Sequence, residues 1–303
     1  MNHRTPLFCQ RWRDHRSSYR PAGEVINPND FDVAPISMSE AKQFVISTHY
    51  SRSYCACRFR YGLFSHTITK NHWHQNGLTP ELVGVAVFSM PMSTKTLTNI
   101  FPGDPRDSVE LGRFVLLDEV KANAESFFFT RCKTLLKREG LRGIVAFADS
   151  TPRSDIYGNI CAPGHLGTVY QSTMAAYLLR SAPRTLRILP NGTVLSPRAI
   201  SKIKTRQRGW RYASQILVAA GATAPKQDED LSKWLDQWIP QLTRPLRHPG
   251  NHRYAWQLSN TAVPVGTPQP YPKNFATAAE MLKLKEKAAN LQTGINPAKR
   301  MAS

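Results

Sequence analysis

The sequence of 303 residues contains only five cysteines, and none of its apolar runs is long. An odd number of cysteines in a chain of this length does not predict a disulfide framework, and it favours a reducing cytoplasm. No run approaches the roughly twenty apolar residues that a membrane-spanning helix needs, so we expect no membrane segment. The first twenty residues carry five arginines with no apolar segment behind them, and we therefore expect no secretory signal.

Acidic residues are also scarce, with 21 Asp and Glu against 40 Lys and Arg, which gives a net charge of +19. Such an excess attracts polyanions over long range and supplies the sequence-independent part of nucleic-acid binding. A protein that is merely basic, or one that binds ribosomal RNA or anionic lipid, is the alternative. The arginines lie in no single amphipathic helix with a broad apolar face, which argues against lipid. We therefore favour nucleic acid as the partner.

The chain divides by composition into three parts. Residues 1–30 are rich in Arg, Ser and Pro and predict a flexible basic arm. Residues 31–258 contain enough periodic apolar sequence for one catalytic domain, with a basic DNA-binding region over 180–258. Residues 259–303 predict a proline-rich linker and a polar helical tail. In the middle part we expect a capping-box helix after Ser37 and, further on, strands over 58–64, 82–88, 109–117 and 143–148, with a helix over 123–140 before the last of them.

One stretch has the form of a functional site. The apolar run 144–147 is typical of a strand buried on both faces, and Asp149 follows it. In open α/β sheets, ligands bind at the carboxyl ends of strands. The glycine-containing turn 164–167 includes His165, and the spacing over 169–179 predicts a helix after it. We predict that Asp149 is a catalytic base without a partner on its own strand. An ordinary capping aspartate is the alternative.

Other groups of polar residues lie in the first half of the chain. His49 and Tyr50 follow the first predicted helix, and a structural role is the alternative to a catalytic one. Glu110 and Arg113 fall within an apolar strand, where charges need partners unless the strand lies at an edge. Two cysteines just before the first expected strand and three histidines between the first two strands could bind zinc, although an ordinary hairpin loop is the favoured explanation. These residues are Cys55, Cys57, His66, His72 and His74.

The strongest concentration of positive charge lies between Arg180 and Arg253, with fourteen Lys and Arg against four Asp and Glu, a net +10. Cations for phosphates and aromatic rings for unpaired bases are what a nucleic-acid surface uses, and a solvated basic helix is the alternative. The residues that we expect to bind DNA are Lys202, Lys204, Arg206, Arg208, Trp210, Arg211, Arg253 and Tyr254.

The order of the predicted elements is that of the acetyltransferase-like fold of the GNAT superfamily. Several short motifs also resemble, in their order and spacing, those of the Mom family of bacteriophage DNA-modification proteins. These motifs cover 48–51, 110–114, 123–126, 147–150, 165–171, 208–210 and 250–254. The resemblance extends over about residues 30–258. It implies an α/β protein with a GNAT-like, acyl-CoA N-acyltransferase-type mixed sheet flanked by helices, between the basic arm and the C-terminal extension.

The resemblance implies conversion of adenine in duplex DNA to N6-(carbamoylmethyl)adenine, which protects a phage genome from restriction in the host cytoplasm. The implied catalytic residues are His49, Tyr50, Arg113, Asp149 and Tyr170. The implied cofactor pocket contains Arg113, Ser126, His165, Gly167 and Tyr170. It also implies iron, with His49 and Tyr50 nearest the metal. The partners that follow are double-stranded DNA and a small-molecule donor, and a dimer is among the oligomeric states left open.

The donor of the transferred group stays open between acetyl-CoA and another two-carbon compound. Acyl-CoA transferases bind the pyrophosphate with a glycine-containing loop, and the corresponding segment 117–126 has no glycine. A simple acetyl transfer would also leave an acetyl amide rather than a carbamoylmethyl group. Two other functions are alternatives: a GNAT-like acyltransferase for a protein or small-molecule amine, and a non-catalytic DNA-binding protein on the same scaffold.

Overall fold

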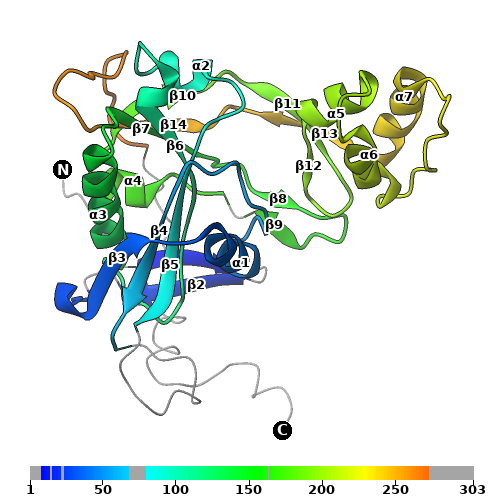
Figure 1. The fold of residues 1–303 in the computed structure, drawn as a ribbon. Coiled ribbons are helices and arrows are strands. Elements are labelled where there is room, and N and C mark those ends of the chain that lie inside the picture. Colours follow the sequence, from blue (N-terminus) through cyan, green and yellow to red (C-terminus); the bar gives the residue numbers. More distant parts are fainter. Residues whose placement is uncertain (1–7, 14–15, 22–23, 68–79, 163, 273–303) are drawn as a thin grey trace, which may run out of the picture. The chain divides into compact units, whose positions relative to one another are not determined.

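The computed structural model describes residues 8–13, 16–21, 24–67, 80–162 and 164–272 (Figure 1). The chain divides into two units, which we call the sheet unit and the basic unit. The sheet unit contains Met1–Ala148, Leu166–Leu179 and Arg253–Ser303, and the basic unit contains Asp149–His165 and Arg180–His252. The expected domain over residues 31–258 includes residues of both units, because the chain leaves the sheet unit after Ala148 and again after Leu179.

A mixed sheet of seven strands forms the centre of the sheet unit, in the order β10-β14-β7-β6-β5-β4-β3. Its strands are β3 (Phe31–Pro35), β4 (Phe59–Ser65), β5 (Glu81–Ser89), β6 (Ser108–Leu116), β7 (Gly143–Ala148), β10 (Ala176–Arg180) and β14 (His252–Gln257). Strands β3 to β6 pair in antiparallel fashion, and β6 pairs with β7 in parallel. The expected α/β fold with a mixed sheet is confirmed.

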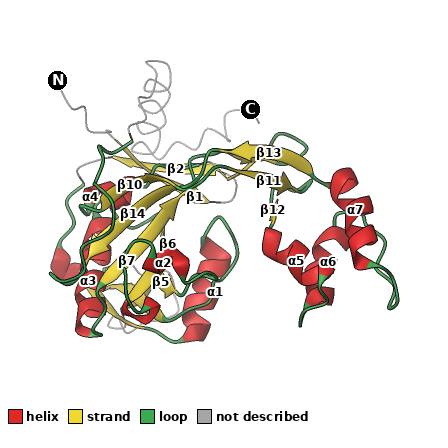
Figure 2. Cartoon of the chain, turned by 90° about the horizontal axis from the view of Figure 1, so that it is seen from above, coloured by secondary structure: helices red, strands yellow, loops and turns green. Residues whose placement is uncertain are grey.

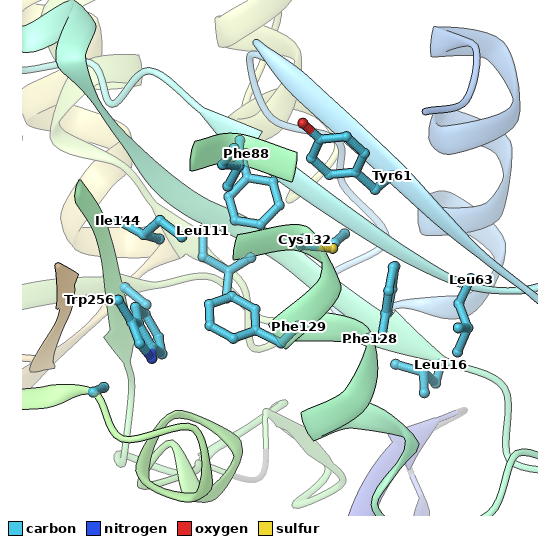
Figure 3. Packing of buried hydrophobic residues seen from close by; sticks show 14 of the residues in the cluster. Tyr61, Leu63, Phe88, Leu111, Leu116, Phe128, Phe129, Cys132, Ile144 and Trp256 are labelled. Atoms are coloured by element: carbon cyan, nitrogen blue, oxygen red, sulfur yellow. The ribbon is translucent and has the colours of Figure 1, made fainter. Parts of the chain in front are cut away.

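Two helices cover opposite faces of this sheet. Helix α1 (Met38–Thr48) begins with the predicted capping box and packs its apolar face against Val85 and Val87 of β5. Helix α3 (Ala124–Arg138) packs against a cluster that contains Phe88 of the same strand (Figure 3). Because successive side chains of a strand point to opposite faces, the two helices lie on different sides. Each fully buried aromatic or aliphatic side chain here contributes roughly 1.5–3 kcal/mol.

The rest of the sheet unit consists of short elements. They are η1 (Pro28–Asp30), α2 (Lys95–Thr98), η2 (Pro105–Asp107) and α4 (Thr168–Ser172). The helix predicted over 169–179 is wrong beyond Ser172, because Met174 has a φ of 60° and the next residues form β10. Over so short an apolar stretch, helical spacing and strand alternation select overlapping residues.

The predicted arm is not without regular structure. Strands β1 (Phe8–Arg13) and β2 (Arg16–Pro21) pair in antiparallel register as a hairpin. Glu24 then accepts the backbone N–H of Ala122 and, through its carbonyl, a bond from Asn123. The polar composition of the arm did not predict this pairing, because the backbone hydrogen bonds of a hairpin do not depend on apolar side chains. No described helix is long and apolar enough to span a membrane.

The basic unit combines short strands with three helices. Strands β8 (Arg153–Ser154) and β9 (Ile160–Ala162) form a hairpin, and β11 (Arg184–Ile188) lies between β12 (Val194–Leu195) and β13 (Arg244–His248). The helices are α5 (Pro197–Lys204), α6 (Trp210–Val218) and α7 (Leu231–Leu242), which Figure 2 shows grouped together. Their shared core contains Ile203, Leu217 and Trp234, one residue from each helix. The unit has fourteen Lys and Arg against six Asp and Glu.

Candidate functional site

Asp149 lies at the start of the basic unit and is held by three donors. Its Oδ1 atom accepts bonds from His248 Nε2 at 2.8 Å and from the backbone N–H of Thr151 at 2.9 Å. Its Oδ2 atom accepts a bond from the guanidinium of Arg153. None of these donors belongs to β7, the strand that Asp149 follows. Its main partner comes from a strand 99 residues further along the chain, which no local pattern indicates.

His248 is completely buried, and the hydrogen bonds around it define its tautomer. The Nδ1 atom accepts the backbone N–H of Gly250 at 3.0 Å, so the ring hydrogen lies on Nε2 and is donated to Asp149. Gly250 has a φ of 95°, and a Cβ there would overlap the carbonyl oxygen of Ser181. Only glycine fits this close approach. The turn after β13 thus orients the imidazole, and the imidazole orients the carboxylate.

The donors around Asp149 determine its acidity. Burial by itself raises the pKa of Asp149, but the bonds from His248, Arg153 and Thr151 outweigh burial and hold the pKa below its usual value. A carboxylate with a lowered pKa and three donors is a weak base. The geometry therefore favours Asp149 as an anionic anchor for Arg153 and His248 over its predicted role as a general base.

A second polar group lies in the sheet unit, where α1 ends. The rings of His49 and Tyr50 are stacked, with centroids 4.3 Å apart. His49 Nδ1 accepts the backbone N–H of Ser51 at 3.1 Å and lies 2.8 Å from the Ser51 hydroxyl. The hydroxyl of Ser53 donates to that of Ser51 at 3.2 Å. A short hydrogen-bonded loop therefore holds the imidazole in one orientation.

Arg113 on β6 is bound to the same loop. Its Nε donates to the Ser53 carbonyl and its second terminal nitrogen to the Ser53 hydroxyl, both at 2.8 Å. Arg113 and His49 are thus linked through two serines, so the structure brings together two residues that the sequence analysis placed in one site. Because Ser53 engages two nitrogens of the guanidinium, Arg113 positions this loop as well as carrying charge.

Tyr170 on α4 lies close to further ionisable groups of the sheet unit. Burial raises the pKa of Tyr170, and the nearby Tyr50, Tyr254 and Glu110 raise it further, so the phenol stays protonated. Burial also raises the pKa of Glu110, although Arg113 acts in the opposite direction. Glu110 was absent from the predicted site residues. The signal for it was a carboxylate inside an apolar strand.

The other residues of the predicted cofactor pocket are divided between the units. Ser126 and Gly167 belong to the sheet unit, where the Ser126 hydroxyl lies 3.0 Å from that of Ser172 on α4. His165 belongs to the basic unit, and its backbone N–H donates to the Asp149 carbonyl at 2.7 Å. Crowding by neighbouring atoms displaces water and lowers the pKa of His165, although the residue keeps an exposed surface.

The segment before α3 does not fit the pyrophosphate of acetyl-CoA in the usual manner. An acyl-CoA transferase needs free backbone N–H groups there. In this chain the Ala122 N–H donates to a carboxylate oxygen of Glu24 at 2.6 Å. One backbone N–H of this segment is thus already bound to an internal carboxylate. This contact agrees with the absence of glycine between residues 117 and 126.

The described residues do not assemble the predicted metal sites. A metal on His49 Nε2 requires a hydrogen on Nδ1, which would break the bond from the Ser51 N–H. Among the residues that the structure describes, no group of three or more His, Cys, Asp or Glu could hold a metal ion. The donor set around His49 and Tyr50 therefore does not fit a resident iron ion.

The residues that could have bound zinc have other partners where they are described. The Cys57 thiol donates to the carbonyl of Phe59 at 3.5 Å, and His66 Nε2 lies 2.8 Å from the carboxylate of Asp32. Burial raises the pKa of the Cys55 thiol, which opposes formation of the thiolate that zinc needs. His72 and His74 lie outside the described residues.

Helices α5 and α6 and the turn between them carry six of the eight predicted DNA-binding residues. Lys204, Arg206, Arg208 and Arg211 are exposed, and Lys202 is half-buried. The guanidinium groups of Arg206 and Arg211 lie 5.1 and 5.5 Å from the centroid of the Trp210 ring. Trp210 also packs against the core of the basic unit. These contacts make it a poor platform for an unpaired base. Tyr212, which the sequence analysis did not select, is 83% exposed.

Tyr254 does not belong to a DNA surface, and its prediction is wrong. The residue is completely buried in β14, its hydroxyl donates to the carbonyl of Leu166, and Gln171 donates to that hydroxyl at 3.2 Å. Its neighbour Arg253 is half-buried and donates to the carbonyl of Leu178 at 2.7 Å. Tyr254 and Trp256, two residues apart in β14, lie on an inward face of the strand.

These features define an α/β protein with a hydrogen-bonded polar cluster on its sheet unit and a basic unit that exposes cationic side chains on and between its helices. The Mom protein family model matches residues 30–273. The chain therefore belongs to the Mom protein family. Membership of this family implies that the protein acts in the modification of DNA.

Comparison with solved structures gives one looser likeness. The chain is similar to a tandem GNAT protein from the clavulanic acid biosynthesis pathway, in a structure without AcCoA. The two share 7% sequence identity, and the match covers 76% of this chain and 99% of that chain with a TM-score of 0.38. So low a TM-score supports no conclusion about function. No curated protein matches the chain.

Proposed function

We propose that the protein is a transferase that modifies the N6 amino group of adenine in duplex DNA to N6-(carbamoylmethyl)adenine and so protects phage DNA from restriction. The observation that carries the proposal is the family match over residues 30–273 in a chain whose basic unit exposes cationic helices. A DNA-modifying enzyme needs such a surface, because contacts to phosphates supply most of the affinity for duplex DNA.

The DNA surface is the exposed side of α5, α6 and the turn between them. Lys204, Arg206, Arg208 and Arg211 supply charge for phosphates. Tyr212 and Gln215 are exposed on α6 together with Arg211. Arginine and glutamine are side chains that read base edges in the major groove. The opposite side of the same helix packs into the core through Leu217, so α6 presents one face to solvent.

The proton acceptor in this proposal is Glu110. The adenine amine must lose a proton as its new bond to carbon forms, because its lone pair is delocalised into the ring. A carboxylate whose pKa is raised by burial is a better base than one held by three donors, which favours Glu110 over Asp149. Tyr170 stays protonated and serves as a hydrogen-bond donor. The His49 ring, with its hydrogen on Nε2, is a second donor.

The donor must form a bond between N6 and a methylene carbon. Acetyl-CoA reacts with an amine at its carbonyl carbon and would leave an acetyl amide. A donor whose methylene carbon carries a leaving group would give the carbamoylmethyl product directly, since the leaving group departs with the bonding electrons. The Ala122 N–H already donates to Glu24, which also argues against binding of the CoA pyrophosphate in the usual way.

Plasmid DNA from cells that express the protein provides the test. The DNA is digested to nucleosides, and the adenosine fraction is weighed by mass spectrometry, with Glu110→Gln as the matched inactive variant. We expect the parent to add C2H3NO to a fraction of the adenines and the variant to add nothing. An added acetyl group would support the acetyltransferase alternative. Unmodified adenine in the parent would refute the proposed function.

A further inference from the structure

The hairpin formed by β8 and β9 has an unusual tip. Ile156 and Tyr157 are adjacent, 63% and 83% exposed, and form the turn between the two strands (Figure 1). A single exposed apolar residue needs no explanation, but adjacent exposed ones on a protruding turn mark a contact surface. We propose that this tip is a wedge that inserts between stacked bases of duplex DNA and helps to extrude the target adenine.

The turn is built to present these side chains rigidly. The carboxylate of Asp155 accepts the backbone N–H groups of Tyr157 and Asn159 at 2.8 and 2.9 Å, and it accepts the Asn159 side chain at 2.9 Å. Asx turns of this kind order a short loop without an apolar core. The exposed side chains therefore do not collapse onto the hairpin, and most of the ordering that a wedge needs is complete before DNA binds.

The hairpin is also fixed to the rest of the basic unit. The Ile156 N–H donates to the carbonyl of Pro190 at 2.8 Å. Gly192, with a φ of 78°, approaches so closely that a Cβ there would lie 2.7 Å from the sulfur of Cys161. At the stem, Arg244 donates to the carbonyl of Ser154 at 3.0 Å. Because both strands of the hairpin are held in place, the tip can keep its position when it meets stacked bases. An unsupported loop would move instead.

Charge identifies duplex DNA as the occupant rather than a second protein. The hairpin belongs to a unit with fourteen Lys and Arg against six Asp and Glu, and Arg153 of β8 and Arg244 of the neighbouring β13 lie at its stem. DNA-bending proteins insert isoleucine and similar apolar side chains between base steps from such cationic surfaces. An enzyme that acts on the N6 atom of a paired adenine must take that base out of the stack.

The wedge and Asp149 lie on one continuous segment. Asp149 marks the base of the hairpin, where its carbonyl accepts the His165 N–H at 2.7 Å. Ile156 lies seven positions after Asp149, and extended chain of that length spans at most about 25 Å. This inference rests on the proposed function, because it requires DNA as the substrate.

The test compares two pairs of exposed residues in the same unit. The wedge variant is Ile156→Ser with Tyr157→Ser, and the matched control is Tyr212→Ser with Ile216→Ser on α6, where Tyr212 is 83% and Ile216 39% exposed. The target context is first read from the modified positions of plasmid DNA. A duplex with 2-aminopurine at that position then reports unstacking by its fluorescence, and anisotropy reports binding.

We expect the wedge variant to bind the duplex within about threefold of the parent, because it loses no cation. Its 2-aminopurine signal at saturation should fall at least fivefold, and plasmid modification at least tenfold. The control should bind more weakly yet give the full signal at saturation. Opposite an abasic site, where extrusion costs less, the wedge variant should regain the signal.

Three results would overturn the wedge. The variant could modify plasmid and unstack 2-aminopurine as the parent does. It could fail equally on the abasic duplex, which would place the tip in a step other than unstacking. It could change the sedimentation mass while modification persists, which would make the tip a protein contact. If the parent itself leaves plasmid adenine unmodified, the proposed function fails and the wedge fails with it.

Discussion

The buried imidazole of His248 donates to Asp149 across 2.8 Å, although 99 residues separate them in the chain. The turn at Gly250 fixes the imidazole tautomer, and Arg153 holds the second carboxylate oxygen. A carboxylate with these partners stabilises its surroundings through charge-assisted hydrogen bonds, which are stronger than neutral ones. We therefore interpret Asp149 as the anchor at the base of the β8–β9 hairpin.

The first prediction concerns coupling between Asp149 and Arg153. Asp149→Asn and Arg153→Gln should each lower the free energy of unfolding by about 1.5–3 kcal/mol, the usual range for a charged hydrogen bond. The double variant should be little less stable than either single one, because both remove the same interaction. Urea unfolding monitored in the basic unit measures this. Destabilisations that simply add would show that the two side chains act independently.

The same carboxylate predicts a pH dependence. The pKa of Asp149 lies below its ordinary value of 3.8 in the folded protein, so its stabilisation is present above pH 3.8 and disappears as pH falls through the folded pKa. Unfolding curves of the parent and Asp149→Asn should converge at low pH and separate above about pH 4. Asp236→Asn, which alters an exposed carboxylate on α7, is the control. A constant difference at every pH would contradict this assignment.

A third prediction tests Glu110 as the base. Glu110→Gln should keep the fold and duplex affinity but lower adenine modification about a hundredfold or more, the usual contribution of a general base. Arg113 lowers the Glu110 pKa, so Arg113→Gln should raise it further. Carbon-13 NMR titration of the Glu110 carboxyl measures that shift. Full modification by Glu110→Gln would contradict this role and make Asp149 the next candidate for the base.

The fourth prediction concerns salt dependence of duplex binding. Alanine at Arg208 and Arg211 should flatten the plot of log affinity against log salt by about 0.9 for each phosphate that the variant no longer neutralises. Alanine at Lys226 and Lys233, two lysines of the same unit outside α5 and α6, is the matched control with an equal change of charge. Equal slopes for the two double variants would place the DNA surface away from α6.

A last prediction separates packing from recognition at Tyr254. Tyr254→Phe removes the hydroxyl that bonds to the Leu166 carbonyl and Gln171. Removing this buried hydrogen-bond partner should cost about 1–3 kcal/mol of stability. Thermal unfolding should detect this cost, whereas duplex affinity and its salt slope should stay unchanged. A selective decrease in DNA binding would restore Tyr254 to the interface.

Local rules predicted the elements whose signals lie within a few residues. Ser37 and Glu40 form the expected capping box, and α1 begins directly after it. The apolar run at 144–147 is the buried strand β7, and Asp149 follows its end. Most of the positive charge of α5, α6 and the turn between them lies in exposed side chains, which the core does not require. In each case the deciding interaction is local or is a simple preference for water.

The partners of these elements required the tertiary structure. Strand β10 replaced a predicted helix because pairing with β14 outweighs a weak local spacing. Tyr254 turned inward and Tyr212 outward although both lie among basic residues, because burial depends on which face meets the core. Asp149 gained His248, and Glu110 gained Tyr170, from distant segments. Composition and motifs indicated the class of chemistry, whereas the tertiary structure decided which distant side chains surround each carboxylate.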